Sequence, residues 1–194
     1  MFDSHCTAVT DYSNEKIGLE IFFDIKDGNS MVRSYSHVDI TFKPVLPLYI
    51  SSIPFSMEYR IKHDDSASLN VYARCLFYAN AHTTYSLTVL FELVGGMKNL
   101  INLKKLNDDV KIGEDSYELY DGIFGNFDGY IFVAIKGNRR LNIDFNGFFK
   151  ALPKNSKINS NQYLYSLSVG SQVVQGSGTV KFTGFSAAVN YLSH

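Results

Sequence analysis

Few side chains in this chain of 194 residues combine the types and spacing that catalysis or metal binding requires. The densest group around any of the five histidines is His63-Asp64-Asp65. Adjacent residues rarely converge on one ion, so this group indicates a solvated turn more than a metal site. The two cysteines, Cys6 and Cys75, allow at most one internal disulfide and cannot form a zinc site alone. We therefore expect neither a metal nor another cofactor.

A strand expected over residues 84–94 carries the first sign of a binding surface. Ser86 and Thr88 alternate with the apolar residues Leu87 and Val89. Hydroxyl groups do not suit a dry core, so this face of the strand is expected to look into water or a groove. A second polar stretch, GSQVVQGSG, follows a serine-containing strand near the C-terminus. Small polar side chains on strands suit the floor of a groove for a long polar ligand.

The composition excludes several classes of protein. Lys and Arg number 18 against 19 Asp and Glu, and the net charge of −1 argues against a nucleic-acid partner. No apolar run approaches the ~18–20 residues that cross a bilayer, so no membrane partner is expected. The first six residues carry neither a basic nor an apolar segment, so they do not predict a signal peptide. The 15 Phe and 13 Tyr, without any Trp, favour strands joined by turns.

Apolar and polar residues alternate with the period of β-strands along most of the chain. The predicted strands cover residues 17–26, 38–43, 57–62, 69–78, 84–94, 129–136, 162–169 and 173–187. A hairpin is expected between residues 108 and 120, with its turn at Gly113-Glu114-Asp115. Many short strands at close spacing predict a sandwich or a barrel, and no linker divides residues 1–194, so one all-β domain is expected.

One segment has helical spacing instead. Its apolar residues, at positions 145, 148, 149 and 152, recur at i, i+3, i+4 and i+7. Asp144 suits the N-cap and Pro153 the stop. We therefore expect one short helix near residues 144–152, lying on a sheet.

Ordered segments from about Cys6 to Asn190 resemble the motifs of a known family. The segments are VRSYS at 32–36, ISSIP at 50–54, YELYDG at 117–122, YIFVA at 130–134, IDFNGFFKAL at 143–152, QYL at 162–164 and GFSAAVN at 184–190. Together they resemble glycoside hydrolase family 12, secreted endo-β-1,4-glucanases and xyloglucanases, and the last segment is similar to oomycete members. The resemblance implies a concanavalin-like β-jelly-roll sandwich with one helix.

The resemblance also implies a site for retaining hydrolysis, with two glutamates ~5–5.5 Å apart. Ser86 stands at the position of the family's nucleophile and Gln172 at that of the acid/base. Cys75 matches the aspartate that orients the nucleophile, with one residue of slip around 72–75 left open. A serine needs an activating base and a glutamine amide has no proton to deliver, so ordinary catalysis is not expected. Glu92, on the predicted strand face of Ser86, is ~20 Å away and too far to substitute.

The missing Trp bears on substrate binding, because family members line their groove with Trp that stacks on sugar rings. Leu90 stands at the usual Trp position, and Thr88 and Leu19 are the other expected groove residues. The resemblance further implies that the first strands of the family domain are missing from this chain. Cys6 then looks like the second half of a family disulfide whose partner lies upstream.

Three functions follow as hypotheses. The first is a catalytically inactive paralogue of an extracellular β-1,4-glucan or xyloglucan hydrolase, a monomer that binds protein as a decoy or effector, for example a host glucanase-inhibitor protein. The second is a glycan-binding module that keeps the groove and holds β-glucan or xyloglucan. The third is a weakly active hydrolase. The missing Trp counts against the second and the two missing glutamates against the third, so the sequence favours the first.

Overall fold

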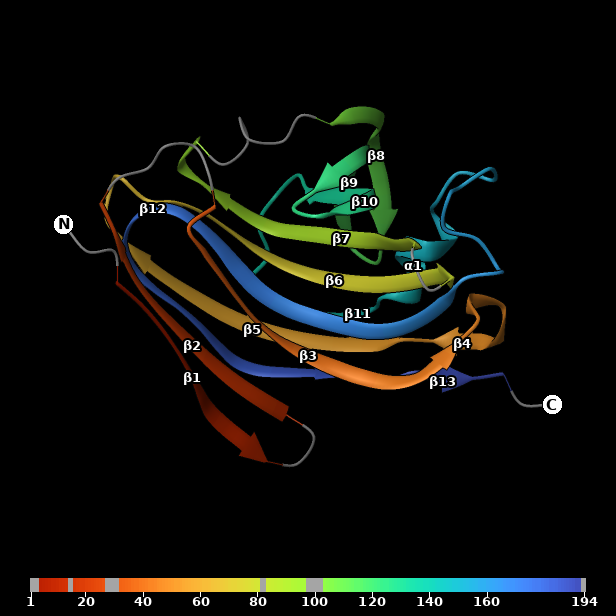
Figure 1. Ribbon diagram of the computed structural model, residues 1–194, viewed down its shortest axis with the longest axis horizontal. Coiled ribbons are helices and arrows are strands. Elements are labelled where there is room, and N and C mark those ends of the chain that lie inside the picture. The colour runs from red at the N-terminus through yellow and green to blue at the C-terminus, as the bar shows by residue number, and fades with distance from the viewer. Residues whose placement is uncertain (1–3, 14–15, 27–31, 81–82, 97–102, 193–194) are drawn as a thin grey trace.

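The computed structural model describes residues 4–13, 16–26, 32–80, 83–96 and 103–192. These residues form strands almost throughout, with one short α-helix and one 3-10 turn (Figure 1). In chain order the elements are β1 (Ser4–Ser13), β2 (Lys16–Ile25), β3 (Ser34–Val45), η1 (Pro47–Tyr49), β4 (Ile50–Ser52), β5 (Pro54–His63), β6 (Ser68–Asn80), β7 (Thr83–Val94), β8 (Lys104–Ile112), β9 (Asp115–Phe124), β10 (Phe127–Ala134), β11 (Arg140–Asp144), α1 (Asn146–Lys150), β12 (Tyr163–Ala187) and β13 (Asn190–Tyr191). Within the described residues, no helix is long and apolar enough to span a membrane.

The long strand β12 belongs to two sheets and joins them. Its first half pairs with β3 and β6, in a sheet ordered β3-β12-β6-β7-β10-β9-β8, here called the first sheet. Its second half lies between β2 and β5, in a second sheet ordered β1-β2-β12-β5-β11. All of these pairings are antiparallel except that of β7 with β10. Figure 1 shows β12 curving from one sheet into the other. The expected all-β sandwich is confirmed.

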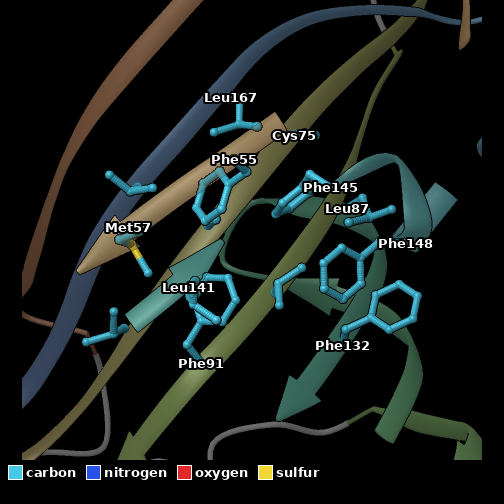
Figure 2. Packing of buried hydrophobic residues seen from close by; sticks show 14 of the residues in the cluster. Phe55, Met57, Cys75, Leu87, Phe91, Phe132, Leu141, Phe145, Phe148 and Leu167 are labelled. Carbon is cyan, nitrogen blue, oxygen red and sulfur yellow. The ribbon is translucent and has the colours of Figure 1, made fainter. Parts of the chain in front are cut away.

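The core lies between the two sheets. On β6, the odd-numbered residues from Leu69 to Phe77 are fully buried in it, as the period of two requires. Phe55 and Met57 face them from β5 (Figure 2). The even-numbered residues of β6 point the other way, with Ser86, Thr88 and Leu90 of β7. We call this side of the first sheet, away from the core, the groove face.

The predicted helix exists but is shorter than expected, because it covers only residues 146–150. Phe148 is fully buried and packs edge-on against Tyr117 and Phe132, with 5.0 Å between ring centroids in both pairs (Figure 2 shows Phe132). Asp144 accepts hydrogen bonds from the backbone N–H groups of Asn146 at 3.0 Å and Ile53 at 2.7 Å. The N-cap residue is Phe145, however, which makes no side-chain capping bond, so the prediction of Asp144 as the N-cap is wrong by one residue. Asp144, the last residue of β11, instead ties the start of the helix to the backbone just before β5.

The structure corrects the sequence prediction in three places. The segments 162–169 and 173–187 are one strand, not two. The strands β1, β4, β11 and β13 were not predicted. Glu92 does not share the face of Ser86: the β6–β7 register shifts between the pairs Tyr72–Leu90 and Val71–Glu92. That shift turns Glu92 to the core side of the sheet, where it binds Arg139 with an Nη2–Oε1 distance of 2.6 Å.

Candidate functional site

Ser86 and Gln172, the two positions matched to catalytic glutamates, both lie on the groove face. β6 separates them: Ser86 pairs with Leu76 and Gln172 pairs with Asn70. Between these two levels β6 turns Tyr72 and Arg74 to the same face. The side chains that lie between Ser86 and Gln172 therefore come from β6.

Cys75, matched to the aspartate that orients the nucleophile, lies on the opposite face of β6 and so points away from Ser86 and Gln172. It is fully buried in the core, where its strand partners are Leu87 and Leu167 (Figure 2). The burial raises the pKa of its thiol well above the ordinary value. Because neighbouring residues of a strand face opposite ways, the groove-face position belongs to Arg74. A cation thus stands where one residue of slip would place the orienting aspartate of the family.

Arg74 is almost completely buried, with 2% of its surface exposed. Its Nε donates to Thr88 Oγ1 at 3.1 Å, and its Nη1 donates to the hydroxyl of Tyr35. Its Nη2 has no hydrogen-bond partner in the described part of the chain, and no carboxylate there pairs with it. Four rings surround its Cζ at 5.0–5.7 Å from their centroids: Tyr35, Tyr72, Phe124 and Phe127. Cation–π attraction and two hydroxyls hold this charge in place of an ion pair.

The side chain of Gln172 is fixed by an amide pair. Asn70 Nδ2 donates to Gln172 Oε1 at 2.9 Å, and the backbone N–H of Gln172 donates to Asn70 Oδ1 at 3.2 Å. Gln172 is 3% exposed and Ser86 fully buried, and Ser86 Oγ has no partner among the described residues. Neither side chain offers a proton or an activated nucleophile to a ligand.

The turn between β9 and β10 lies over these side chains. A Cβ placed on Gly125 would be 3.8 Å from Gln172 Nε2 and 3.9 Å from Arg74 Nη2. Phe124 and Phe127 flank this glycine and are the two rings that this hairpin adds around the guanidinium. The turn therefore closes the centre of the groove face.

Of the three other predicted groove residues, two lie on the groove face and one does not. Thr88 is on the groove face, but it is buried and bound to Arg74. Leu90 is on that face too, in a small apolar cluster with Tyr72, Phe124, Ile131 and Val133. The expectation for Leu19 is wrong: it is 1% exposed and belongs to the core of the second sheet, because it sits at an inward position of β2.

A cavity lies on this face, beside the closed centre. It has a volume of about 390 Å³ and lies over β3, β12 and β6. Its lining consists of Tyr35, His37, Asp39, Thr41, Arg74, Leu76, Asn126, Phe127, Tyr165, Ser166 and Ser168. His37 Nε2 and Asp39 Oδ2 are 3.2 Å apart. The cavity thus combines aromatic rings, hydroxyls, one carboxylate and one buried guanidinium.

The predicted polar turn at His63-Asp64-Asp65 is a turn built by hydrogen bonds. Asp64 accepts bonds from Ser66 and, through its other oxygen, from the backbone N–H of Ser177 at 2.9 Å. These bonds, that from the Ser66 side chain foremost, lower the pKa of the Asp64 carboxyl. Cys6 and Cys75 are both free thiols, the first exposed and the second buried.

Comparison with known proteins gives one consistent family. The family model for glycosyl hydrolase family 12 matches residues 3–190. Xyloglucan-specific endo-beta-1,4-glucanase 1 of Phytophthora sojae is 29% identical over 192 residues, which are 96% of this chain and 80% of that protein. A Phytophthora nicotianae protein named inactive glycoside hydrolase XLP1 is 28% identical, with the same two coverages.

Solved structures agree on the fold. The catalytic domain of Humicola grisea Cel12A aligns with a TM-score of 0.85 at 20% identity, covering 97% of this chain and 87% of that one. Trichoderma harzianum endoglucanase 3 aligns with a TM-score of 0.82 at 23% identity, covering 97% and 85%. At these identities the likeness establishes the jelly-roll architecture alone.

Proposed function

Because this chain belongs to glycosyl hydrolase family 12, we propose that it keeps the fold of the family without its hydrolytic chemistry and acts by binding a protein. The observation that carries the proposal is the closed centre of the groove face. Arg74, Ser86 and Gln172 are all at most 3% exposed there. The role that fits is that of a decoy or effector-like relative of a glucanase.

Two physical arguments support the loss of hydrolysis. Retaining cleavage needs one carboxylate to attack and one carboxyl group to protonate the leaving oxygen, and Ser86 and Gln172 supply neither. The transition state also develops positive charge on the sugar ring. A buried guanidinium between the two positions repels that charge, whereas the aspartate expected from the family would stabilise it.

Hydrolysis of xyloglucan and mixed-linkage β-glucan tests this proposal. The native chain is compared with the Ser86→Glu, Gln172→Glu double variant and with a triple variant that adds Arg74→Asp, and the Phytophthora sojae glucanase is the positive control. We expect no turnover by the native chain or by the double variant, because Arg74 still fills the centre. Turnover by the native chain would refute the proposal, and turnover by the triple variant alone would identify Arg74 as part of the block.

Protein binding is favoured over binding of a glucan chain because a sugar chain needs an open floor, which the buried centre does not provide. An exposed apolar patch offers an alternative surface. Leu48, Tyr49, Tyr191 and Leu192 are 47%, 43%, 54% and 49% exposed. The pairing of β13 with β4 and a 2.9 Å bond from the Leu192 N–H to the Tyr49 carbonyl hold them together. Clustered apolar surface of this kind is typical of protein interfaces.

The proposed partner is a host glucanase-inhibitor protein. We propose that this chain acts as a single family domain and binds that partner outside the cell. Its affinity is measured for the native chain and for Tyr191→Asp, with Ile123→Asp as the control, since Ile123 is 68% exposed on β9. We expect Tyr191→Asp to weaken binding and Ile123→Asp to leave it unchanged. Equal affinity of all three proteins would exclude the patch, and lack of binding by the native chain would exclude this partner.

A further inference from the structure

We propose that the cavity beside Arg74 binds a carboxylated sugar unit, a uronate, through its carboxylate and hydroxyl groups. This inference goes beyond the proposed function, because it requires neither hydrolysis nor the protein partner. It rests on the charge of Arg74, the size of the cavity, and the chemistry of the residues around it.

The charge argument begins with the missing counter-ion. Buried charges in proteins are normally paired with an opposite charge, because desolvation is costly. Arg74 is 2% exposed, has no carboxylate partner in the described residues, and leaves its Nη2 without an acceptor. The rings around it compensate only part of that cost. A ligand carboxylate is the group that would complete the coordination of this guanidinium, since its two oxygens match the fork of donors.

The cavity suits a small ligand. Its volume of about 390 Å³ is near the lower end of the range for small-molecule sites, roughly 300–1,000 Å³. Arg74 lines it from β6, and Tyr35, which takes the hydrogen bond of the guanidinium, is 40% exposed at its edge. A ligand that displaces the Tyr35 hydroxyl therefore reaches the charge without unfolding the sheet.

The remaining lining selects hydroxyl groups. Asp39 and His37 lie in the cavity as a pair, and Asp39 can accept hydrogen bonds from a polyol. Its negative charge opposes a second carboxylate or a phosphate. Tyr165 and Phe127 add ring faces of the kind on which a pyranose stacks. A ring that carries one carboxylate and several hydroxyls can pair with Arg74, donate hydrogen bonds to Asp39 and stack on the aromatic rings. An acidic peptide offers Asp39 no such hydroxyl donors, and its carboxylates are repelled by that residue.

Calorimetric titration of the whole chain tests the inference with four probes: D-glucuronate, D-glucose, the dicarboxylate D-glucarate and a short aspartate-containing peptide. We expect glucuronate to bind at least about tenfold more tightly than each of the others, which corresponds to about 1.4 kcal/mol. Equal affinity for glucose would overturn the role of charge. Tighter binding of the peptide would assign the site to a protein carboxylate, and no binding of glucuronate at millimolar concentration would refute the proposal.

Variants connect the binding to the named residues. Arg74→Met is expected to lower glucuronate affinity at least about tenfold, as loss of a buried charge partner does, and Arg74→Lys to lower it less. Arg140→Met, a change of an 80% exposed arginine side chain in the second sheet, is the matched control and should bind as the native chain does. If Arg74→Met fails to fold, Asp39→Asn provides the test. It should raise the affinity for glucarate relative to that for glucuronate, because it removes a repulsive charge. An unchanged ratio of the two affinities contradicts the proposal that Asp39 faces the bound ligand.

Discussion

At the scale of single residues, substitutions of Arg74 can separate the contributions of side-chain volume and charge to stability at one buried position. Arg74→Ala removes the side chain from among four rings, and we expect a loss of about 2–4 kcal/mol of unfolding free energy, as for other large cavities. Arg74→Met fills much of the same volume without the charge and should lose clearly less, because replacing buried ions by apolar groups is often neutral. Urea denaturation followed by circular dichroism measures both. Equal losses would mean that the hydrogen bonds and cation–π contacts, not the volume, stabilise the fold here.

The two thiols are expected to differ in reactivity for a reason visible at each residue. Cys6 is exposed, whereas Cys75 is fully buried and its pKa is raised by desolvation, so little thiolate forms there. A chromogenic disulfide reagent at mildly alkaline pH should titrate one thiol quickly and the second only after urea is added. Cys6→Ser should abolish the fast phase and Cys75→Ser the slow one. Two fast thiols in the native protein would contradict the burial of Cys75.

The sequence located the site only in part, and the reason lies in the period of β6. Ser86 and Gln172 lie on the same face of the first sheet, and their match to the two catalytic glutamates stays a prediction. On β6 the match alone left Arg74 and Cys75 interchangeable. The alternation of Leu69, Val71, Ala73, Cys75 and Phe77 would have resolved it, since one apolar face places Arg74 on the other. The aromatic rings around Arg74 come from β3, β6, β9 and β10. A local sequence pattern cannot predict that side chains from four separate strands lie around one residue.

At the scale of elements, prediction succeeded for the longer strands, because each of them carries several apolar residues that the core buries. The buried strands β2, β5, β6, β7 and β10 were expected close to their observed bounds. β1 was missed because residues 4–10 are all exposed and carry no apolar stripe, and β11 because five residues give too short a pattern. The predicted division of β12 fell at residues 170–172, beside Gly170, which here lies within one continuous strand that changes sheets.

Gly176 is the residue at which β12 changes sheets, and its replacement tests that role. Its φ of +97° is unfavourable for other residues, and an added Cβ would lie 2.4 Å from the Cα of Ala67. We expect Gly176→Ala to cost about 2 kcal/mol or more of unfolding free energy. Gly184→Ala on the same strand is the control, because its nearest contact would be an ordinary 3.7 Å to the Lys16 side chain. Urea midpoints compare the two, and similar losses would show that glycine content alone matters.

At the scale of the whole molecule, the first sheet has polar residues buried on the side that faces away from the core. There Arg74 donates to Thr88, and Asn70 and Gln172 bond to each other. The first sheet is therefore buried on both faces where the β9–β10 turn covers it. The overall architecture nevertheless aligns with that of Humicola grisea Cel12A with a TM-score of 0.85.

The burial of several tyrosines, in the core and on the groove face, predicts how stability changes at alkaline pH. Desolvation raises the pKa of Tyr59, Tyr72 and Tyr117 above 10.0, the value expected in the unfolded chain, and that of Cys75 above 9.0. The native state therefore retains protons that the unfolded state loses, so stability is complete below about pH 9 and falls as the pH rises beyond it. The urea midpoint, followed by circular dichroism, should decrease steadily above that pH. In the native protein part of the 13 tyrosines should ionise only as the sheet signal disappears. If the tyrosinate absorbance reached its full value while the sheet signal was intact, the buried tyrosines would be accessible to solvent in the native protein, and the prediction would be wrong.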